Sequence, residues 1–559
     1  MIYLIKYDIL FILYQEDLTL DKQKNTKFQK IFSGTIILIT AIITLFIGLL
    51  AIGKTAFFNT VINFASEKTD IKIDNILLNI LFTFFTLGIL YFIYITVLPK
   101  ISKKILFILM LVFTLSLGFW WVNYLKLKPI SDQSMVVYCA EKILDNDLCS
   151  ILDPGNYLSR NPHQLGFVLY IAIIFKIFNT RNVIFLQNIA VIFSTLSAIT
   201  MYFIVKELFE EEIVHKLSLL FISFFSIYFV FFCPHVYGNL PGLSFGLIAI
   251  LFTLKFINSN KFWHLIIVAF SITISYLLKN NYEIFLIAII IELALKILIE
   301  IKTFKIKPIN NFFKNNIFKS FSGIIIIVSI VFGIKTLVYT CFENYTNYYL
   351  QNGVPVISYI YMGIAEPVTL TPGWYTGDVE IIYNESGYNK EKSSEKTKKL
   401  LEKRIEYLSQ NSDYTFNYFK SKIETTWLNP TFQTIWCSTP SLILDLDPAY
   451  NNYIAPKKIL ISILTGKAFY IEEQIMDIYQ ILMFLISSFA LIRNFKEGSL
   501  KKMFLPLIFL GGFSFHLLWE TKSIYVLQYF YLLIPYSVYG IYNIFSLILK
   551  KIGNEKQRL

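Results

Sequence analysis

The sequence predicts an all-α polytopic membrane protein with a bundle of about 12–13 transmembrane helices. Composition is the first observation behind this prediction. Of 559 residues, 55% are hydrophobic and 16% are charged, whereas soluble domains average roughly 25% charged residues. The mean hydropathy is correspondingly high, at +0.58. The second observation is that apolar runs recur along the chain, each about long enough to cross a hydrocarbon layer of ~30 Å as a helix.

About twelve of these runs have the length of a full crossing. The predicted spans are 31–53, 75–98, 105–123, 183–205, 217–233, 240–257, 263–278, 282–301, 320–342, 473–494, 503–519 and 524–548. A further apolar run, 165–178, is shorter. Its length fits a re-entrant or interfacial helix better than a crossing.

Lysine clusters between the spans predict the orientation of the bundle, because short cytoplasmic loops collect basic residues. All five clusters fall on one side if the run 165–178 does not cross the membrane. We therefore expect both termini in the cytoplasm. The clusters are Lys22, Lys24, Lys27 and Lys30; Lys100, Lys103 and Lys104; Lys302, Lys305, Lys307, Lys314 and Lys319; Lys496, Lys501 and Lys502; and Lys550 and Lys551.

Two polar segments then face outward and divide the chain. Residues 1–342 are expected to form a transmembrane catalytic module that includes a first external loop at 124–164. Residues 343–472 are expected to form an external loop domain, followed by C-terminal transmembrane helices at 473–559. Within the loop domain, apolar residues at helical spacing predict surface helices over 393–408 and 416–427.

Composition also excludes several classes of function. The net charge of +12 arises from lysines scattered between apolar runs, not from one basic face, so no nucleic-acid partner is expected. No Walker loop, HExxH or GxSxG motif occurs, and the five cysteines and five histidines show no metal-type spacing. We expect no transition-metal site and no obligatory cofactor. The bias toward Lys, Ile, Asn, Phe and Tyr indicates an AT-rich, bacterial genome, and therefore a bacterial plasma membrane.

The first external loop places a carboxylate close to the membrane. Asp132 follows the third predicted span by about nine residues, so we expect it at the interface. A carboxylate at that depth is suited to accept a proton from an attacking hydroxyl. Ser131 or Asp132 could alternatively cap a helix over 134–144. Spacing alone leaves both roles open.

The same loop ends with hydrogen-bond donors just before the short apolar run. Tyr157, Arg160, His163 and Gln164 occupy this stretch. The guanidinium group matches phosphate oxygens with two donors at once. Alternatively, Arg160 reaches toward lipid headgroups and His163 caps a helix.

These motifs together resemble the GT-C superfamily of membrane glycosyltransferases. The resemblance rests on three motifs: Pro129-x-x-Asp132 after an early span, a loop with Tyr157, and Asn161-Pro-His-Gln-x-Gly166 at the start of an apolar helix. The pattern is similar to protein O-mannosyltransferase-like and aminoarabinose-transferase-like enzymes. The resemblance implies a GT-C-like bundle with extracytoplasmic loop helices, and Asp132 as the catalytic base or acceptor-binding carboxylate. Gln133 stands where relatives often have a second acidic residue.

The resemblance also assigns roles at two outer turns between spans. It implies that Lys279 binds the carrier phosphate, although a lysine near a span end can equally extend toward lipid headgroups. His235 and Tyr237 lie in a Pro- and Gly-rich turn. They are expected to line the acceptor groove, or to be the aromatic lining of a helix break.

A third outer turn, between the last two predicted spans, resembles the pattern Glu-x-x-x-Arg-Tyr of relatives. Glu520 and Tyr525 match this pattern, but Ile524 stands where the arginine is often found. Lys522 is the candidate to supply that charge. Glu520 and Lys522 could also form a simple ion pair.

The resemblance implies inverting transfer of a sugar from a polyprenyl-phosphate carrier to a glycan, protein or lipid acceptor outside the cell. Arg160, Lys279 and Lys522 are expected to bind the donor phosphate. Some GT-C oligosaccharyltransferases use a divalent cation, so the resemblance leaves a divalent cation open for this chain. The alternatives are a lipid-linked-glycan flippase or transporter, and an O-antigen-type polymerase or ligase. The residues expected to contact substrate are Gln133, Tyr157, His163, Gln164, His235, Tyr237, Glu520 and Tyr525.

Overall fold

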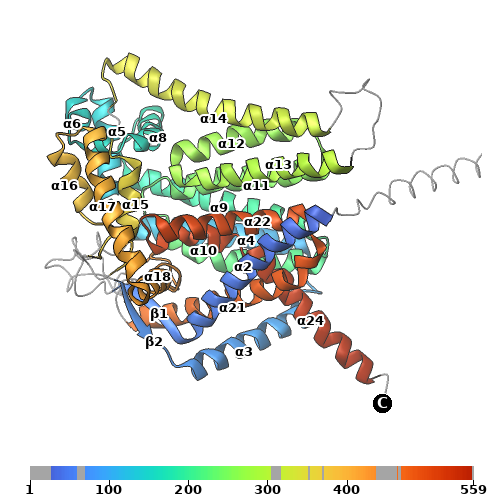
Figure 1. The fold of residues 1–559 in the computed structure, drawn as a ribbon. Helices are drawn as coiled ribbons and strands as arrows, with labels where there is room; N and C mark the ends of the chain where they lie inside the picture. The colour runs from blue at the N-terminus through green and yellow to red at the C-terminus, as the bar shows by residue number, and fades with distance from the viewer. Residues whose placement is uncertain are drawn as a thin grey trace, which may run out of the picture.

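Long helices run side by side through the molecule in a computed structural model, and Figure 1 shows shorter helices gathered at one end of them. The structure describes residues 27–58, 69–303, 316–350, 353–367, 371–435, 462–463 and 467–556. The lysines predicted at 22, 24, 305, 307 and 314 lie outside these ranges.

Nine helices in the described ranges are long and apolar enough to cross a membrane. They are α2 (Lys27–Gly53), α3 (Ile76–Phe92) with η1 (Ile93–Val97), α4 (Lys103–Leu125), α9 (Val183–Leu208), α10 (Glu212–Phe232), α11 (Asn239–Ser259), α14 (Asn316–Thr346), α21 (Lys467–Asn494) with η7 (Phe495–Glu497), and α22 (Leu500–Leu518). A tenth crossing is formed if α23 (Ser523–Tyr531) and α24 (Ile534–Lys556), bent by 50° at their junction, make one span. The prediction of an all-α polytopic protein is confirmed.

Two of the predicted spans, 263–278 and 282–301, form helices that are not among these nine. Helix α12 (Trp263–Leu278) has only 16 residues, and α13 (Glu283–Thr303) carries Glu292, Lys296 and Glu300 in its interior. Both still pack within the bundle, α12 against α11 and α14, and α13 against α14 and α22. Lys296 pairs with Glu300 at 2.8 Å.

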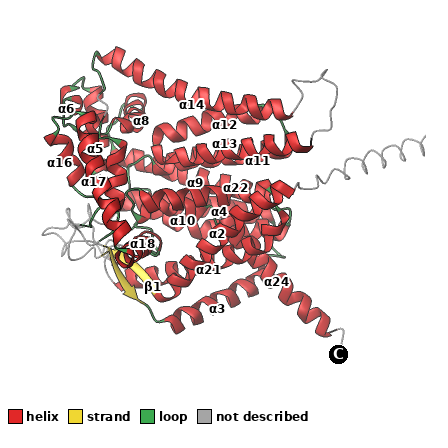
Figure 2. Cartoon of the chain, viewed as in Figure 1, coloured by secondary structure: helices red, strands yellow, loops and turns green. Residues whose placement is uncertain are grey.

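A β-hairpin between the first two spans was not predicted. Strands β1 (Lys54–Phe58) and β2 (Thr69–Ile73) pair antiparallel, with Lys54 opposite Ile73. Figure 2 shows them as yellow arrows in a chain whose other regular elements, where it is described, are helices. The backbone N–H of Ala56 donates to the carbonyl of Leu428 at 3.0 Å, and Lys54 pairs with Glu424 at 2.7 Å. The hairpin is therefore held by tertiary contacts to α18 (Ser412–Trp427), which sequence periodicity does not report.

The two segments predicted to be external form shorter helices at one end of the bundle (Figure 1). The first segment contains α5 (Asp132–Leu144), α6 (Cys149–Leu152), α7 (Tyr157–Arg160), η2 (Pro162–Gln164) and α8 (Leu165–Ile177). The second contains α15 (Val356–Ile364), α16 (Asp378–Glu385), α17 (Lys390–Gln410) and α18. The helices predicted over 393–408 and 416–427 are thus confirmed. Helix α8 leaves Ile173 and Ile177 exposed by 56% and 70%, which suits a helix in contact with lipid.

The lysine-rich turns gather away from these short helices. The side-chain amide of Gln29 donates to the carbonyl of Gly498 at 2.9 Å, so the start of α2 meets the turn between α21 and α22. Lys502 lies over the ring of Phe209, 5.6 Å from its centroid, which joins the end of α9 to the same turn. The start of α2, the end of α9 and the turn between α21 and α22 therefore lie together at the end of the bundle opposite the shorter helices.

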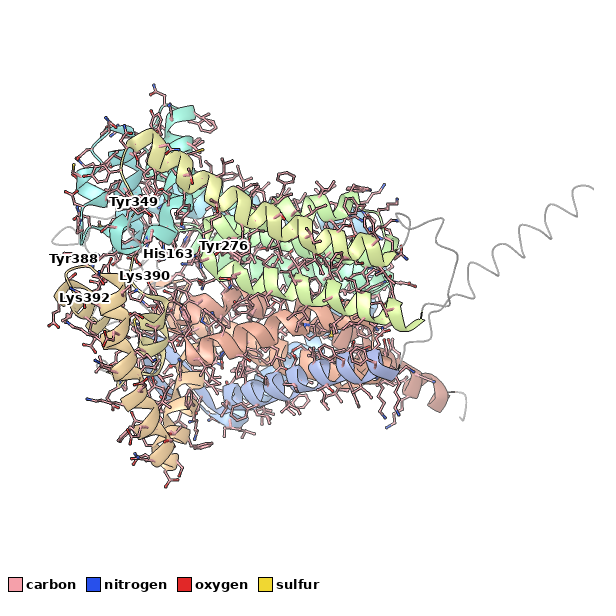
Figure 3. All side chains as sticks on the ribbon, turned by 45° about the horizontal axis from the view of Figure 1, so that its top comes forward. His163, Tyr276, Tyr349, Tyr388, Lys390 and Lys392 are labelled. Carbon is pink, nitrogen blue, oxygen red and sulfur yellow. The ribbon has the colours of Figure 1, made fainter. Side chains whose placement is uncertain are left out.

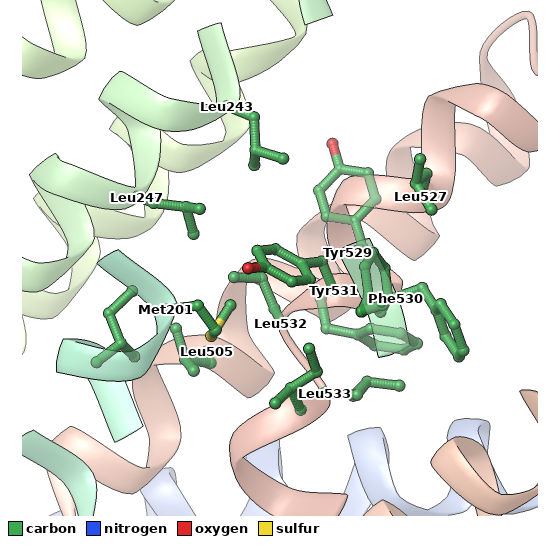
Figure 4. Close-up of a cluster of buried hydrophobic side chains, with 14 of the residues drawn as sticks. Met201, Leu243, Leu247, Leu505, Leu527, Tyr529, Phe530, Tyr531, Leu532 and Leu533 are labelled. Carbon is green, nitrogen blue, oxygen red and sulfur yellow. The ribbon is translucent and has the colours of Figure 1, made fainter. Parts of the chain in front are cut away.

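Apolar packing at the bend between α23 and α24 fixes the C-terminal helices. Figure 4 shows Phe530, Tyr531, Leu532 and Leu533 packed with side chains of other helices, including Met201. All of them are buried, so they hold the helices together by close van der Waals packing. This core fixes the direction of α23, whose N-terminus carries one of the predicted site residues.

Candidate active site

Close backbone packing brings three turns together at the end of the bundle that carries the shorter helices. A Cβ atom added at Gly166 would collide with the carbonyl of Leu277, and one at Gly238 with the carbonyl of Leu278. The starts of α8 and α11 therefore pack directly on the last turn of α12. Lys279 follows that turn, so glycine at both positions is needed to seat this lysine among the other loops.

Lys279 lies between two tyrosine rings. Its ammonium nitrogen is 4.1 Å from the ring centroid of Tyr237 and 5.6 Å from that of Tyr525. The pKa of Lys279 is lowered to about 8, chiefly by burial and to a smaller extent by Lys522, while Asp132 and Glu520 oppose the shift. A cation held over aromatic faces is stabilised without a carboxylate salt bridge, so its charge is able to attract an anionic ligand.

Asp132 opens α5 within electrostatic range of this lysine. Its side chain is exposed. Ser131 occupies the N-cap position, with φ of 50°, but its side chain makes no capping hydrogen bond. Asp132 is the first helical residue rather than the cap. The negative charge of Asp132 thus opposes the lowering of the pKa of Lys279.

A network of polar side chains surrounds Tyr237. The backbone N–H of Val236 donates to the side-chain oxygen of Gln133 at 2.9 Å, and the amide of Gln164 donates to the Tyr237 hydroxyl. Tyr157 is hydrogen-bonded to Tyr237 as well. Burial, followed by neighbouring charges that include Asp132, raises the pKa of Tyr157 and of Tyr237. Both phenols therefore stay neutral and can donate hydrogen bonds.

The two predicted histidines are uncharged at neutral pH. Burial, with the positive charges of Lys279 and Lys335, lowers the pKa of His163 to about 4. Burial, with Lys279 and Lys522, lowers the pKa of His235 to about 3. Figure 3 shows His163 at the end of the bundle near Tyr276. These imidazoles can exchange hydrogen bonds with a ligand but cannot supply positive charge.

Arg160 is paired with the second external segment. Its guanidinium lies 2.7 Å from a carboxylate oxygen of Glu380 on α16, and Tyr375 is also hydrogen-bonded to Glu380. The backbone carbonyl of Arg160 accepts a hydrogen bond from Val354 at 3.0 Å. A phosphate bound by Arg160 would have to compete with Glu380.

The turn between α22 and α23 completes the site. Lys522 is the N-cap residue of α23 and lies 4.9 Å from the ring centroid of Trp374. The backbone N–H of Glu520 donates to the carbonyl of Tyr359 at 3.1 Å. Lys422, from α18, donates to the carbonyl of Trp519 at 2.9 Å, which ties this turn to the external domain.

Sequence reasoning missed three residues of this arrangement. Tyr359, Trp374 and Glu380 all come from the segment 343–472, which carries no recognisable motif around them. Their proximity to the site is visible only in the folded chain.

No group of three or more His, Cys, Asp or Glu side chains among the described residues is arranged to hold a metal ion.

Comparison with known families bears on the same turns. Residues 163–307 match the family model described as dolichyl-phosphate-mannose-protein mannosyltransferase. The match confirms the resemblance to GT-C membrane glycosyltransferases. The matched segment contains His163, Gln164, His235, Tyr237 and Lys279, but it ends before the turn with Glu520 and begins after Asp132.

Among solved structures, the GT-C-like chain is similar to the archaeal oligosaccharyltransferase AglB from Archaeoglobus fulgidus, in a complex with an inhibitory peptide and a dolichol-phosphate. The identity is 12% and the TM-score is 0.40, over 81% of this chain and 52% of that protein. The chain thus spans about half the length of this oligosaccharyltransferase. No curated protein matches it.

Proposed function

We propose that this GT-C-like chain transfers a sugar from a polyprenyl-phosphate carrier to an acceptor at the extracytoplasmic face of the membrane. The observation that carries the proposal is Lys279, a partly buried cation held between Tyr237 and Tyr525 within electrostatic range of Asp132. One turn thereby provides a positive charge for a leaving phosphate beside a carboxylate able to accept a proton.

The donor phosphate binds Lys279 and Lys522, whose positive charges lie close enough to influence each other. Asp132 takes the proton of the acceptor hydroxyl as its oxygen forms a bond to the anomeric carbon. The bond from that carbon to the phosphate oxygen breaks, and polyprenyl phosphate leaves with the electron pair. Attack opposite the leaving group inverts the anomeric centre. Arg160 joins the phosphate when Glu380 releases it.

We place the site in the extracytoplasmic headgroup zone of a bacterial plasma membrane. The support for this placement is the prediction that the lysine clusters of the short loops face the cytoplasm. The partners are membrane lipids, the lipid-linked sugar, and a glycan, protein or lipid acceptor. The transmembrane module at 1–342 would supply Asp132 and Lys279, and the segments 343–472 and 473–559 would close the site. The mechanism needs no obligatory cofactor.

The test replaces Asp132 with Asn in membranes supplied with radiolabelled polyprenyl-phosphate sugars. We expect transfer to fall by about 100- to 10,000-fold, the usual contribution of a general base. The matched control is Asp145→Asn, because Asp145 lies in the same loop but pairs with Arg181.

Undiminished transfer by Asp132→Asn removes this residue from the mechanism. No transfer by the wild type from any donor contradicts the proposed function and favours a flippase or transporter, which reconstitution with a fluorescent lipid-linked glycan would detect.

A further inference from the structure

Lys335 stands alone as a charged residue within the apolar part of α14. It is the only charged residue in the predicted span 320–342. Phe332 and Leu337, close to it on the helix, are exposed by 52% and 60%, so this stretch of α14 presents apolar surface to lipid. A charged side chain is unfavourable among lipid chains unless polar groups or an opposite charge accompany it. The surroundings of Lys335 therefore need an explanation.

Two tyrosines hold the ammonium group of Lys335 in place. Its nitrogen donates a hydrogen bond to the hydroxyl of Tyr276 on α12 at 2.8 Å. The same nitrogen is 4.7 Å from the ring centroid of Tyr276 and 6.0 Å from that of Tyr339. Lys335 is partly exposed, and Tyr276 is only 6% exposed. The ammonium group thus has a defined position at the seam between α12 and α14.

This position lies near one boundary of the bundle. Tyr276 belongs to the last turn of α12, and Figure 3 shows it close to the end that carries the shorter helices. Helix α14 continues from Lys335 to Thr346, about 16 Å further along its axis. The hydroxyl of Tyr339, one turn after Lys335, already donates to the carbonyl of Pro162 at 2.9 Å. The ammonium group is therefore near the level of lipid headgroups rather than at the centre of the hydrocarbon layer.

The tyrosines leave the charge of Lys335 without a counter-charge. Within the described part of the chain, no carboxylate forms an ion pair with Lys335, and the Tyr276 hydroxyl is its one hydrogen-bond acceptor. An ammonium group has three N–H donors. Two of them remain for oxygen atoms of a ligand that approaches from the lipid.

We infer that Lys335 binds the phosphate of an anionic phospholipid, in the leaflet next to the shorter helices. A phosphodiester headgroup offers two unesterified oxygens, which match the two remaining N–H donors, and its acyl chains can lie along the exposed surface at Phe332 and Leu337. A zwitterionic headgroup carries its own cation, so a headgroup with a net negative charge is favoured. The inference does not depend on the proposed function, because this lipid is neither donor nor acceptor.

The test measures lipid binding to the full chain in neutral detergent by native mass spectrometry. Phosphatidylglycerol and polyprenyl phosphate are titrated separately. Lys335→Met should raise the dissociation constant of the tightest-binding phosphatidylglycerol by about ten- to 150-fold, the effect of losing a hydrogen bond to a charged group. Binding of polyprenyl phosphate should stay unchanged. Tyr276→Phe, which removes the hydroxyl that orients the ammonium group, should weaken phosphatidylglycerol binding by about three- to tenfold.

The matched control is Lys176→Met, because Lys176 is an exposed lysine in the last turn of α8. It removes the same charge and should leave phosphatidylglycerol binding close to that of the wild type. Unchanged binding in both Lys335→Met and Tyr276→Phe overturns the inference and shows that the ammonium group extends toward water. Equal weakening by Lys176→Met also overturns it. Loss of polyprenyl phosphate binding as large as that of phosphatidylglycerol overturns it as well, since Lys335 would then serve the carrier.

Discussion

The pH dependence of donor use offers a sharp test of the role of Lys279. Burial lowers the pKa of this lysine to about 8, so the positive charge that attracts the donor phosphate is lost above that pH. The value of kcat/KM for the donor should therefore fall about tenfold for each pH unit above about 8. The fall should level off after about ten- to 150-fold, because a hydrogen bond to a charged group contributes roughly 1.5–3 kcal/mol.

Loss of folding does not explain such a fall. Between the folded pKa of about 8 and the ordinary lysine value, the unfolded chain binds the proton and the folded chain does not. The contribution of Lys279 to the free energy of unfolding therefore increases as pH rises through this range. Activity and this contribution to stability should change in opposite directions.

The decisive variant is Lys279→Arg, since a guanidinium stays charged throughout the accessible pH range. We expect the fall near pH 8 to disappear in this variant and to persist in the matched variant Lys522→Arg. In the wild type, the fall should appear in kcat/KM but not in kcat, because bound phosphate raises the pKa of the lysine. An unchanged pH profile in Lys279→Arg would refute the assignment of the phosphate site to this residue.

Two further variants test the packing and the charge around the site. Gly166→Ala should destabilise the protein by about 1–3 kcal/mol and lower donor turnover, because the new methyl group meets the carbonyl of Leu277. The control Gly88→Ala, with open space around the added methyl group, should leave thermal unfolding in detergent nearly unchanged. Equal effects of the two substitutions would contradict this reasoning. Glu380→Gln should lower the donor KM by up to about fivefold, because Arg160 is then available to the phosphate. The pair is partly exposed, so the stability change should stay within about 1 kcal/mol, and a raised or unchanged donor KM would show that Arg160 does not bind the donor.

The part of the site that could be predicted from sequence is the part set by membrane topology. Residues such as Lys279, Tyr237 and Gln164 stand at the ends of apolar runs, and alternation of spans places these ends on one side. Their grouping then follows from the small area that a helix bundle offers at one end. The side-chain contacts do not follow, because they depend on close packing at positions such as Gly166 and Gly238.

The second external segment could not be placed in the same way. Its helices α17 and α18 follow from periodicity, but no membrane constraint determines which face of the segment meets the bundle. Tyr359 and Glu380 reach the site through tertiary contacts, to Trp519 and Arg160 respectively. The hairpin at Lys54 was missed for the same reason, since its outer partner is the chain just after α18.

The structure explains why isoleucine can stand at position 524, where relatives often have an arginine, and how the site obtains its positive charge without it. Ile524 is buried, and its backbone N–H donates to the side chain of Gln433 at 3.2 Å, so this position packs into the protein. Lys522, two residues earlier, lies at the N-terminus of α23, where the helix dipole adds further positive character. The positive charge of the proposed phosphate site thus comes from separate segments, with Lys279 after α12 and Lys522 before α23. Loss of one lysine leaves the other in place, so single lysine variants should weaken donor binding without abolishing it.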